Sequence, residues 1–299
     1  MILFYLFINT DVCNLADNTT LYACDTDLSN LLHNLESDTL SAIMWFEANY
    51  MKLNADKCHF LYSGYTFEHI YVNVSNEMIR ESSHEKLLGL TIDKKLTFEK
   101  HLDCMCKKAS SKVSALARMI KFIPLEKKKI LMKALIESQF SYCPLIWMFC
   151  SRKMNNRINH IHERVLRLVY DNYTDSFQDL LLIDNAVCVH HRNIQKVAVE
   201  MFKIKHRLSP NLISDLFEIQ NDERSKRDFH RPKITSVYKG TNSLRNFGPI
   251  VWDTMLPEKL KSIENLNLFK REVKNWTPEN CQCRLCLEYI QNVGFIISK

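Results

Sequence analysis

The chain has 299 residues, of which 46% are apolar and 25% are charged, so it is long enough to bury a core and to form about two domains. This composition excludes an intrinsically disordered protein, and the five glycines and seven prolines argue against a sandwich or propeller built from many tight turns. The formal net charge of +6 is modest, so it permits a nucleic-acid partner without requiring one.

The eleven cysteines are set singly in apolar or helical stretches and lack the regular spacing of a disulfide framework. They indicate reduced thiols and an intracellular protein of the cytoplasm or nucleus. The chain starts with the apolar segment MILFYLFI, which is short, has no basic start and leads to no small-residue cleavage site. Neither a signal peptide nor a membrane partner is therefore expected.

The first hundred residues predict a helix against short antiparallel strands. Two β-prone runs, 12–16 and 20–24, flank Asp17 and Asn18, which are residue types that tolerate a tight hairpin turn. Apolar side chains at helical spacing then predict a helix over 28–49. Three further strand-like runs follow at 58–62, 70–74 and 87–92.

From residue 98 onward the apolar spacing is helical. One long helix is expected from 98 until Pro124 ends it, followed by helices over 125–138, 152–170 and 187–207. Basic side chains lie opposite the apolar stripe of the first of these helices: Lys100, Lys107, Lys108, Lys112, Arg118 and Lys121. The chain after residue 208 is predicted to be irregular and to end in a cysteine-rich tail. The expected fold class is α+β and helix-rich, in three parts: 1–97, 98–207 and 208–299.

Four segments carry a resemblance to a known family. They read NLADNTTLYACDTDLSNLL, WFEANYMKLNADKCHFL, KLLGLTIDKKLTFEKHL and ALIESQFSYCPLIWMFCSRKMNNRINHIHERVLRLVY. In order and spacing they resemble, over nearly all of the chain, the C-terminal part of the reverse transcriptase of non-LTR (LINE-type) retrotransposons, close to jockey-like elements. The resemblance implies a partial polymerase palm over 1–97, then an α-helical thumb and a following helical region. It also implies an RNA template and an RNA:DNA duplex as partners.

The resemblance implies that Asp17 is a Mg²⁺ ligand at the turn of the palm hairpin. In the family, two adjacent aspartates of this hairpin and a third carboxylate upstream hold two Mg²⁺ ions, which are hard cations that prefer oxygen ligands. Here Asn18 stands at the position of the second aspartate, and an amide brings no charge to the site. The twelve-residue segment MILFYLFINTDV, which precedes the hairpin motif, offers no match to the upstream ligand. The metal site is expected to be incomplete and the chain inactive as a polymerase. The alternative for Asp17 and Asn18 is an ordinary turn.

Three further residues are candidates through the resemblance. Lys57 matches a palm lysine near the triphosphate, where an ammonium group can neutralise the departing pyrophosphate. Its alternative is a surface lysine at the start of a strand. Leu88 and Gly89 resemble the hairpin that grips the primer end, where glycine allows a close approach of the backbone. Their alternative is a core strand with a turn glycine.

The basic helix face has a functional and a structural interpretation. The thumb resemblance implies that Lys107, Lys108, Lys112 and Lys121 bind phosphates of the duplex, which is salt-sensitive and independent of sequence. The alternative is a solvated face opposite a core stripe. Near the C-terminus, Cys281, Cys283 and Cys286 lie close enough for Zn²⁺, but no fourth ligand follows, so reduced cysteines are expected there.

The sequence thus leaves three hypotheses. The chain is part of an RNA-directed DNA polymerase, or it is a non-catalytic remnant that binds RNA or RNA:DNA electrostatically, or it is a translated retroelement relic without a selected role. The first requires carboxylates that this sequence does not supply.

Overall fold

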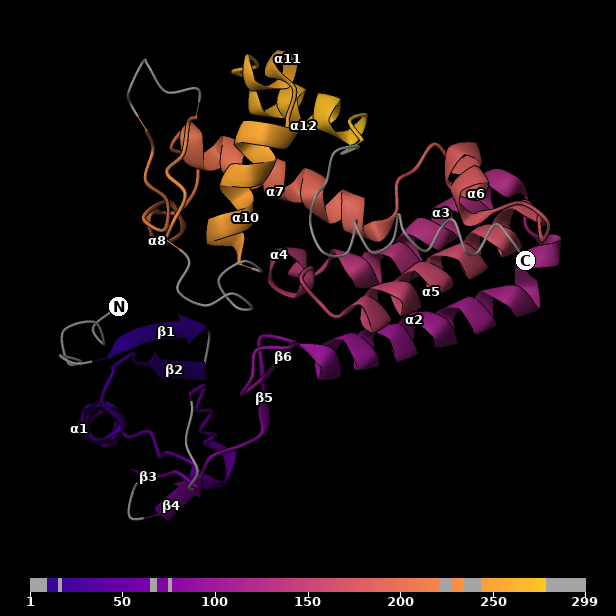
Figure 1. Ribbon diagram of the computed structural model, residues 1–299. Helices are drawn as coiled ribbons and strands as arrows, with labels where there is room; N and C mark the ends of the chain where they lie inside the picture. Colours follow the sequence, from indigo (N-terminus) through magenta and orange to yellow (C-terminus); the bar gives the residue numbers. More distant parts are fainter. Residues whose placement is uncertain are drawn as a thin grey trace. The chain divides into compact units, whose positions relative to one another are not determined.

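A computed structural model describes residues 10–15, 18–64, 69–74, 77–220, 227–233 and 243–277 (Figure 1). The chain forms two compact units, 1–97 and 98–299. In the described residues, helices predominate and the strands form short antiparallel pairs, which is compatible with the predicted α+β class.

The first unit begins with a hairpin and a long helix. Strands β1 (Asp11–Leu15) and β2 (Asn18–Tyr22) pair antiparallel, with Leu15 opposite Asn18. Helix α1 (Leu28–Ala48) follows, within one residue of its predicted range. Asp27 is the N-cap of this helix, and its carboxylate accepts a hydrogen bond from the backbone nitrogen of Asn30 at 3.0 Å. This cap satisfies one of the free N–H groups of the first turn.

A small core joins α1 to a second hairpin. Strands β3 (Tyr71–Val74) and β4 (Glu77–Arg80) pair antiparallel, and alternate residues of β3 are buried. Val72 and Val74 pack with Ile43 of α1, and the backbone nitrogen of Asn73 donates to Glu36 Oε1 at 2.9 Å. The predicted strand over 58–62 is reduced to a single bridge at Phe60, after a 3₁₀ turn over Ala55–Lys57.

The prediction of one strand over 87–92 is wrong, because the glycine within it makes a turn. Strands β5 (His84–Leu87) and β6 (Leu90–Asp93) form a third hairpin, connected by Leu88 and Gly89. Both connecting residues have positive φ angles, 49° and 87°. This is the backbone pattern of the tight two-residue turn that suits the twist of a hairpin.

The second unit starts with parallel helices α2 (Glu99–Met119) and α5 (Arg152–Tyr170), which are packed against each other (Figure 1). The apolar stripe of α2 is buried as predicted, from Leu102 to Ile120, and α5 has its predicted bounds. Between them, the predicted helix over 125–138 is α3 (Leu125–Leu131), a π turn (Met132–Ile136) and a 3₁₀ turn (Glu137–Ser141). The hydroxyl groups of Ser138 and Ser141 bind backbone carbonyls four residues earlier and compete with regular helix bonding.

A buried charged group connects this layer to the next helix. After α4 (Pro144–Trp147) and α6 (Phe177–Asp184), helix α7 (Val189–Lys205) presents Arg192, whose Nη1 lies 2.9 Å from Glu137 Oε2. His162 Nε2 of α5 lies 3.6 Å from Glu137 Oε1, which is an ion-pair distance and too long for a hydrogen bond. The side chain of Glu137 is 13% exposed, so its charge depends on these neighbours.

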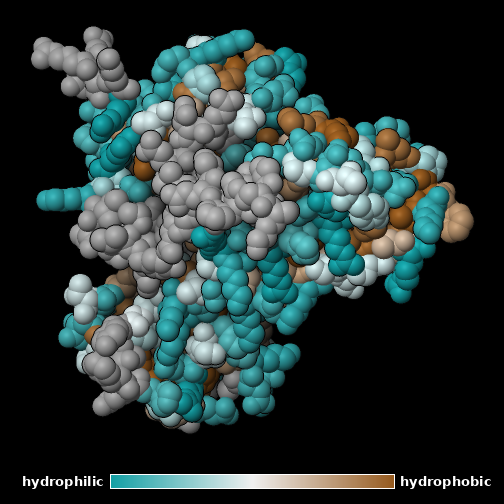
Figure 2. Space-filling model, turned by 45° about the vertical axis from the view of Figure 1, so that its right-hand side comes forward, coloured by the Kyte–Doolittle hydropathy of each residue, from teal (hydrophilic) through white to brown (hydrophobic). Residues whose placement is uncertain are grey.

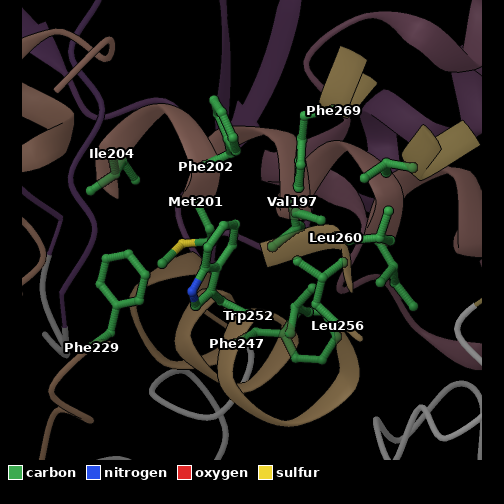
Figure 3. Close-up of a cluster of buried hydrophobic side chains, with 14 of the residues drawn as sticks. Val197, Met201, Phe202, Ile204, Phe229, Phe247, Trp252, Leu256, Leu260 and Phe269 are labelled. Atoms are coloured by element: carbon green, nitrogen blue, oxygen red, sulfur yellow. The ribbon is translucent and has the colours of Figure 1, made fainter. Parts of the chain in front are cut away.

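The C-terminal part packs on α7 and is more regular than predicted. The region after 208 contains α8 (Asn211–Ser214), α10 (Leu244–Ile250), a π turn (Val251–Met255), α11 (Glu258–Lys261) and α12 (Leu266–Lys274). Their apolar side chains surround α7, where Phe202 stacks on Phe269 with ring centroids 4.4 Å apart (Figure 3). Trp252 is also buried there, and its Nε1 donates to Asp228 Oδ2 at 2.6 Å.

Candidate nucleic-acid interface

The first unit places the predicted catalytic positions as follows. Asn18 is the first residue of β2, and Asp17 lies outside the described residues. Lys57 ends the 3₁₀ turn and is exposed. Leu88 and Gly89 form the turn of the β5–β6 hairpin. In the part of the chain that the structure describes, no three His, Cys, Asp or Glu side chains lie close enough to hold a metal ion.

The four lysines predicted to bind phosphates do not share one face. An α-helix turns by about 100° per residue, so Lys108 and Lys112 lie about 100° and about 140° around α2 from Lys107. The flank of Lys107 points toward α5, because its Nζ lies 2.7 Å from Asp103 Oδ2 and Asp103 also pairs with α5. Burial lowers the pKa of His101, and the nearby charge of Lys108 lowers it further, so Lys108 lies on the side of α2 that carries His101. Lys121 lies beyond α2, in the 3₁₀ turn Ile120–Phe122.

Helix α5 carries basic residues that sequence reasoning did not single out. Lys153, Arg157, His160 and Arg164 follow one another at spacings of four, three and four, so they form one strip on the helix. The opposite side of α5 is buried, including Ile158, Val165 and Leu166. The segment RKMNNRINHIHERVLR contains this pattern of basic residues. It can be recognised only when the buried side of the helix is known, because the buried side defines which residues are exposed.

Two contacts bring the exposed sides of α2 and α5 together. Arg157 Nη1 lies 2.5 Å from Asp103 Oδ1, and Arg164 Nη2 donates to Ser114 Oγ at 3.2 Å. Both acceptors lie on α2, eleven residues apart. The guanidinium groups therefore cover the seam between the helices, beside the outward residues of α2.

We define the α2–α5 basic face as the set of basic side chains on either side of this seam. The α2 members are spaced by seven and then eleven residues, so they point outward on one side of that helix. The α5 members belong to the strip of basic residues described above. The members are Lys100, Lys107 and Arg118 of α2, and Lys153, Arg157 and Arg164 of α5. Five of the six residues are exposed, and the side chain of Arg157 is 36% exposed.

Asp103 is the acidic side chain at the centre of this face. Hydrogen bonds from Lys107 and then from Arg157 hold the pKa of its carboxyl below the usual range, so the group is ionised at physiological pH. Its charge offsets one of the basic charges and holds Lys107 and Arg157 in place. Phosphate oxygens accept the same hydrogen bonds as a carboxylate, so both side chains are candidates for contact with a phosphate.

The distance covered by the face suits a nucleic-acid backbone. Eighteen residues separate Lys100 from Arg118, which at 1.5 Å per residue is about 27 Å along α2. This corresponds to about eight base pairs at 3.4 Å each. In Figure 2, hydrophilic residues cover much of the surface seen, interrupted by apolar residues toward the right-hand end.

Two aromatic residues and the cysteines are not members of this face. Trp147 is buried, and its Nε1 donates to the backbone carbonyl of Tyr142 at 2.8 Å, so it is a core residue. Tyr170 is held by a hydrogen bond from its hydroxyl to Asp184. Cys281, Cys283 and Cys286 lie outside the described residues. The following described cysteines form no disulfide bond: Cys24, Cys58, Cys104, Cys106, Cys143, Cys150 and Cys188.

Comparison of the chain with protein-family models, with curated proteins and with solved structures gives no match. Among the described helices, none has a stretch that is both long and apolar enough to cross a bilayer.

Proposed function

We propose that the helical unit binds a nucleic-acid duplex through the α2–α5 basic face, as the thumb of a polymerase related to non-LTR reverse transcriptases. The observation that supports this function is the spacing of the six basic side chains along two packed helices. Such a face contacts phosphates and not bases, so binding is expected to be independent of sequence. RNA:DNA is the duplex that the family resemblance implies.

We also propose that this 299-residue chain does not extend a primer. Asp17 supplies one carboxylate, and Asn18 stands where the resemblance implies the second. Two Mg²⁺ ions at a polymerase site require several anionic oxygens close together. Binding a duplex requires no such convergence, because each basic side chain contacts its own phosphate.

The test is a salt titration of duplex binding, measured by fluorescence anisotropy with a labelled 20-base-pair RNA:DNA duplex. Six phosphate contacts give a slope of log affinity against log salt of about −5, which is a loss of about 10³ between 50 and 200 mM salt. Lys153→Gln together with Arg164→Gln removes two contacts. The slope should become shallower by about 2, and a 20-base-pair duplex of another sequence should behave alike.

A matched control lies on the other flank of α2. Lys108→Gln with Lys112→Gln makes the same change in charge and should leave the slope within experimental error of the unmodified chain. If this control pair weakens binding while the Lys153 and Arg164 pair does not, the interface is the other flank and the proposal for α2–α5 is wrong. A slope near zero for the unmodified chain excludes a phosphate-binding face altogether.

A further inference from the structure

The turn that follows α2 exposes a large aromatic side chain. Phe122 is the last residue of the 3₁₀ turn Ile120–Phe122 and is 89% exposed. A 3₁₀ helix has three residues per turn, so when Ile120 points into the core, the next two side chains point outward. Ile120 is 6% exposed, and its carbonyl accepts a hydrogen bond from the backbone nitrogen of Ile123 at 3.2 Å. The exposure of Phe122 is therefore fixed by an anchored turn.

The surroundings of Phe122 are both apolar and basic. Met119 and Leu125, three residues before and three residues after Phe122, are 50% and 43% exposed, so this segment exposes two further apolar side chains. Residues 118–129 also hold five basic side chains and one acidic side chain: Arg118, Lys121, Lys127, Lys128, Lys129 and Glu126. Glu126 lies 3.8 Å from Lys129, and Lys129 also lies over the ring of Tyr170. We call residues 118–129 the basic aromatic tip.

We propose that the basic aromatic tip binds unpaired nucleotides, with the ring of Phe122 stacked on a base and with Arg118 and Lys121 on the flanking phosphates. The inference rests on the proposed function, because Arg118 belongs to both the tip and the α2–α5 basic face. The partner must be anionic, since the tip is strongly basic. It must also offer a flat apolar surface to a protruding ring, and an unpaired base does so whatever its identity.

The geometry favours an unpaired strand over the duplex itself. Inside a duplex both faces of each base are covered by its neighbours, so a protruding phenyl ring can stack only on a base without a neighbour. The turn lies at the C-terminal end of α2, beyond Arg118, which is where a strand leaving the basic face would emerge. A basic aromatic surface also suits an anionic membrane, but membrane binding uses a whole apolar helix face, and within residues 118–129 the exposed large apolar side chains are those of Met119, Phe122 and Leu125.

The experiment measures anisotropy with three labelled probes: a uridine 15-mer, a blunt 15-base-pair RNA:DNA duplex and the same duplex with a ten-nucleotide single-stranded tail. Phe122→Ala should weaken binding of the 15-mer and of the tailed duplex by roughly 5- to 150-fold, the effect of losing one stacked base. Binding of the blunt duplex should change by less than about twofold. Phe122→Trp should retain binding, whereas Phe122→Leu, which keeps an apolar side chain without a ring, should behave like Phe122→Ala.

Tyr50→Ala is the matched control, because Tyr50 is a fully exposed aromatic residue of the other unit. It should leave binding of all three probes unchanged. The inference is overturned if Phe122→Ala binds the uridine 15-mer as the unmodified chain does, or if that chain does not bind the 15-mer. It is also overturned if Phe122→Leu retains binding, or if Phe122→Ala lowers binding to phosphatidylserine vesicles alone.

Failure of the inference and failure of the proposed function give different results. If the duplex proposal alone is wrong, the blunt duplex shows no salt-dependent binding, while the 15-mer still depends on Phe122. If the inference alone is wrong, the blunt duplex responds to Lys153→Gln with Arg164→Gln, while the 15-mer is insensitive to Phe122.

Discussion

Replacement of Glu137 by glutamine should reduce the stability that the helical unit loses when the pH falls from 5 to 3. Burial by itself would raise the pKa of Glu137, but the neighbouring His162 and Arg192 outweigh burial and lower this pKa from 4.5 to about 2. The folded state therefore stabilises the ionised carboxylate. This contribution is complete above the unfolded pKa of 4.5 and is lost as the pH falls toward 2.

The magnitude follows from the size of the pKa shift. At about 1.4 kcal/mol per pH unit, a shift from 4.5 to about 2 corresponds to about 3 kcal/mol of stability, of which about 2 kcal/mol is lost by pH 3. The group is well buried, so solvent screening reduces this figure little. Glu137→Gln should therefore cost about 3 kcal/mol at pH 7, because it leaves the guanidinium of Arg192 without its partner.

Urea unfolding monitored by circular dichroism at pH 7, 5 and 3 measures this effect, since urea adds no ions that screen the pair. Between pH 5 and pH 3, the variant should lose about 2 kcal/mol less stability than the unmodified chain. Glu163→Gln is the control, because Glu163 also pairs with an arginine, Arg167, at 2.6 Å but on one helix and with more exposure. It should cost less than about 1 kcal/mol. A Glu137→Gln chain that loses as much stability as the unmodified chain between pH 5 and pH 3 would refute the reasoning.

Three further predictions concern the other sites. Neither this chain nor its Asn18→Asp variant should incorporate nucleotides on a primed RNA template with Mg²⁺ or Mn²⁺, and any extension product on a sequencing gel contradicts the incomplete metal site. Asp103→Asn removes the negative charge from the α2–α5 basic face, so duplex affinity at 100 mM salt should rise roughly two- to fivefold, and an unchanged or lower affinity by anisotropy argues against that face. Gly89→Ala puts a Cβ at a φ of 87°, so thermal unfolding of the first unit should show a loss of about 1 kcal/mol or more, whereas no loss would mean that the turn is not strained.

The long helices could be predicted from the sequence because their signal is local and repeated. The range of α5 was correct, since eight buried residues recur on one side of nineteen. The single strand predicted over 87–92 was wrong for the opposite reason, although the resemblance already implied a hairpin at Leu88 and Gly89. The run LLGLTI has the composition of a strand, and its spacing alone does not show that two of its residues form the turn.

The short C-terminal helices were not predictable by periodicity. Helices α8 and α11 have four residues each, which is hardly more than one turn, so no apolar pattern can repeat within them. They are ordered by packing on the apolar cluster around α7, where Leu260 of α11 is buried and Ile213 of α8 is partly buried. The break after α3 likewise reflects tertiary contacts of Glu137 with α5 and α7, which lie 25 and 55 residues further along the chain.

The residues of the basic face on α2 could be predicted in part from the sequence, whereas those on α5 were not predicted. Lysines opposite the stripe of α2 were identified, but the sequence alone assigns Lys107 and Lys108 equally to the exposed side. Only the contacts of Asp103 and Ser114 with α5 show which flank of α2 is continued by a second helix. The relevant set is therefore defined by helix packing, which local spacing does not encode.

Catalysis by a polymerase metal site and phosphate binding by a basic face differ in how precisely the side chains must be positioned. Metal-dependent polymerisation needs several carboxylates within a few ångströms of each other, so an asparagine at position 18 removes one of very few charges from a single point. Phosphate binding by the α2–α5 basic face is spread over about 27 Å, and each side chain contributes about one unit of salt slope. Loss of one such side chain leaves most of the affinity. We therefore expect a chain with Asn18 to bind a duplex without extending it, and the salt slope and the primer-extension assay measure these two properties independently.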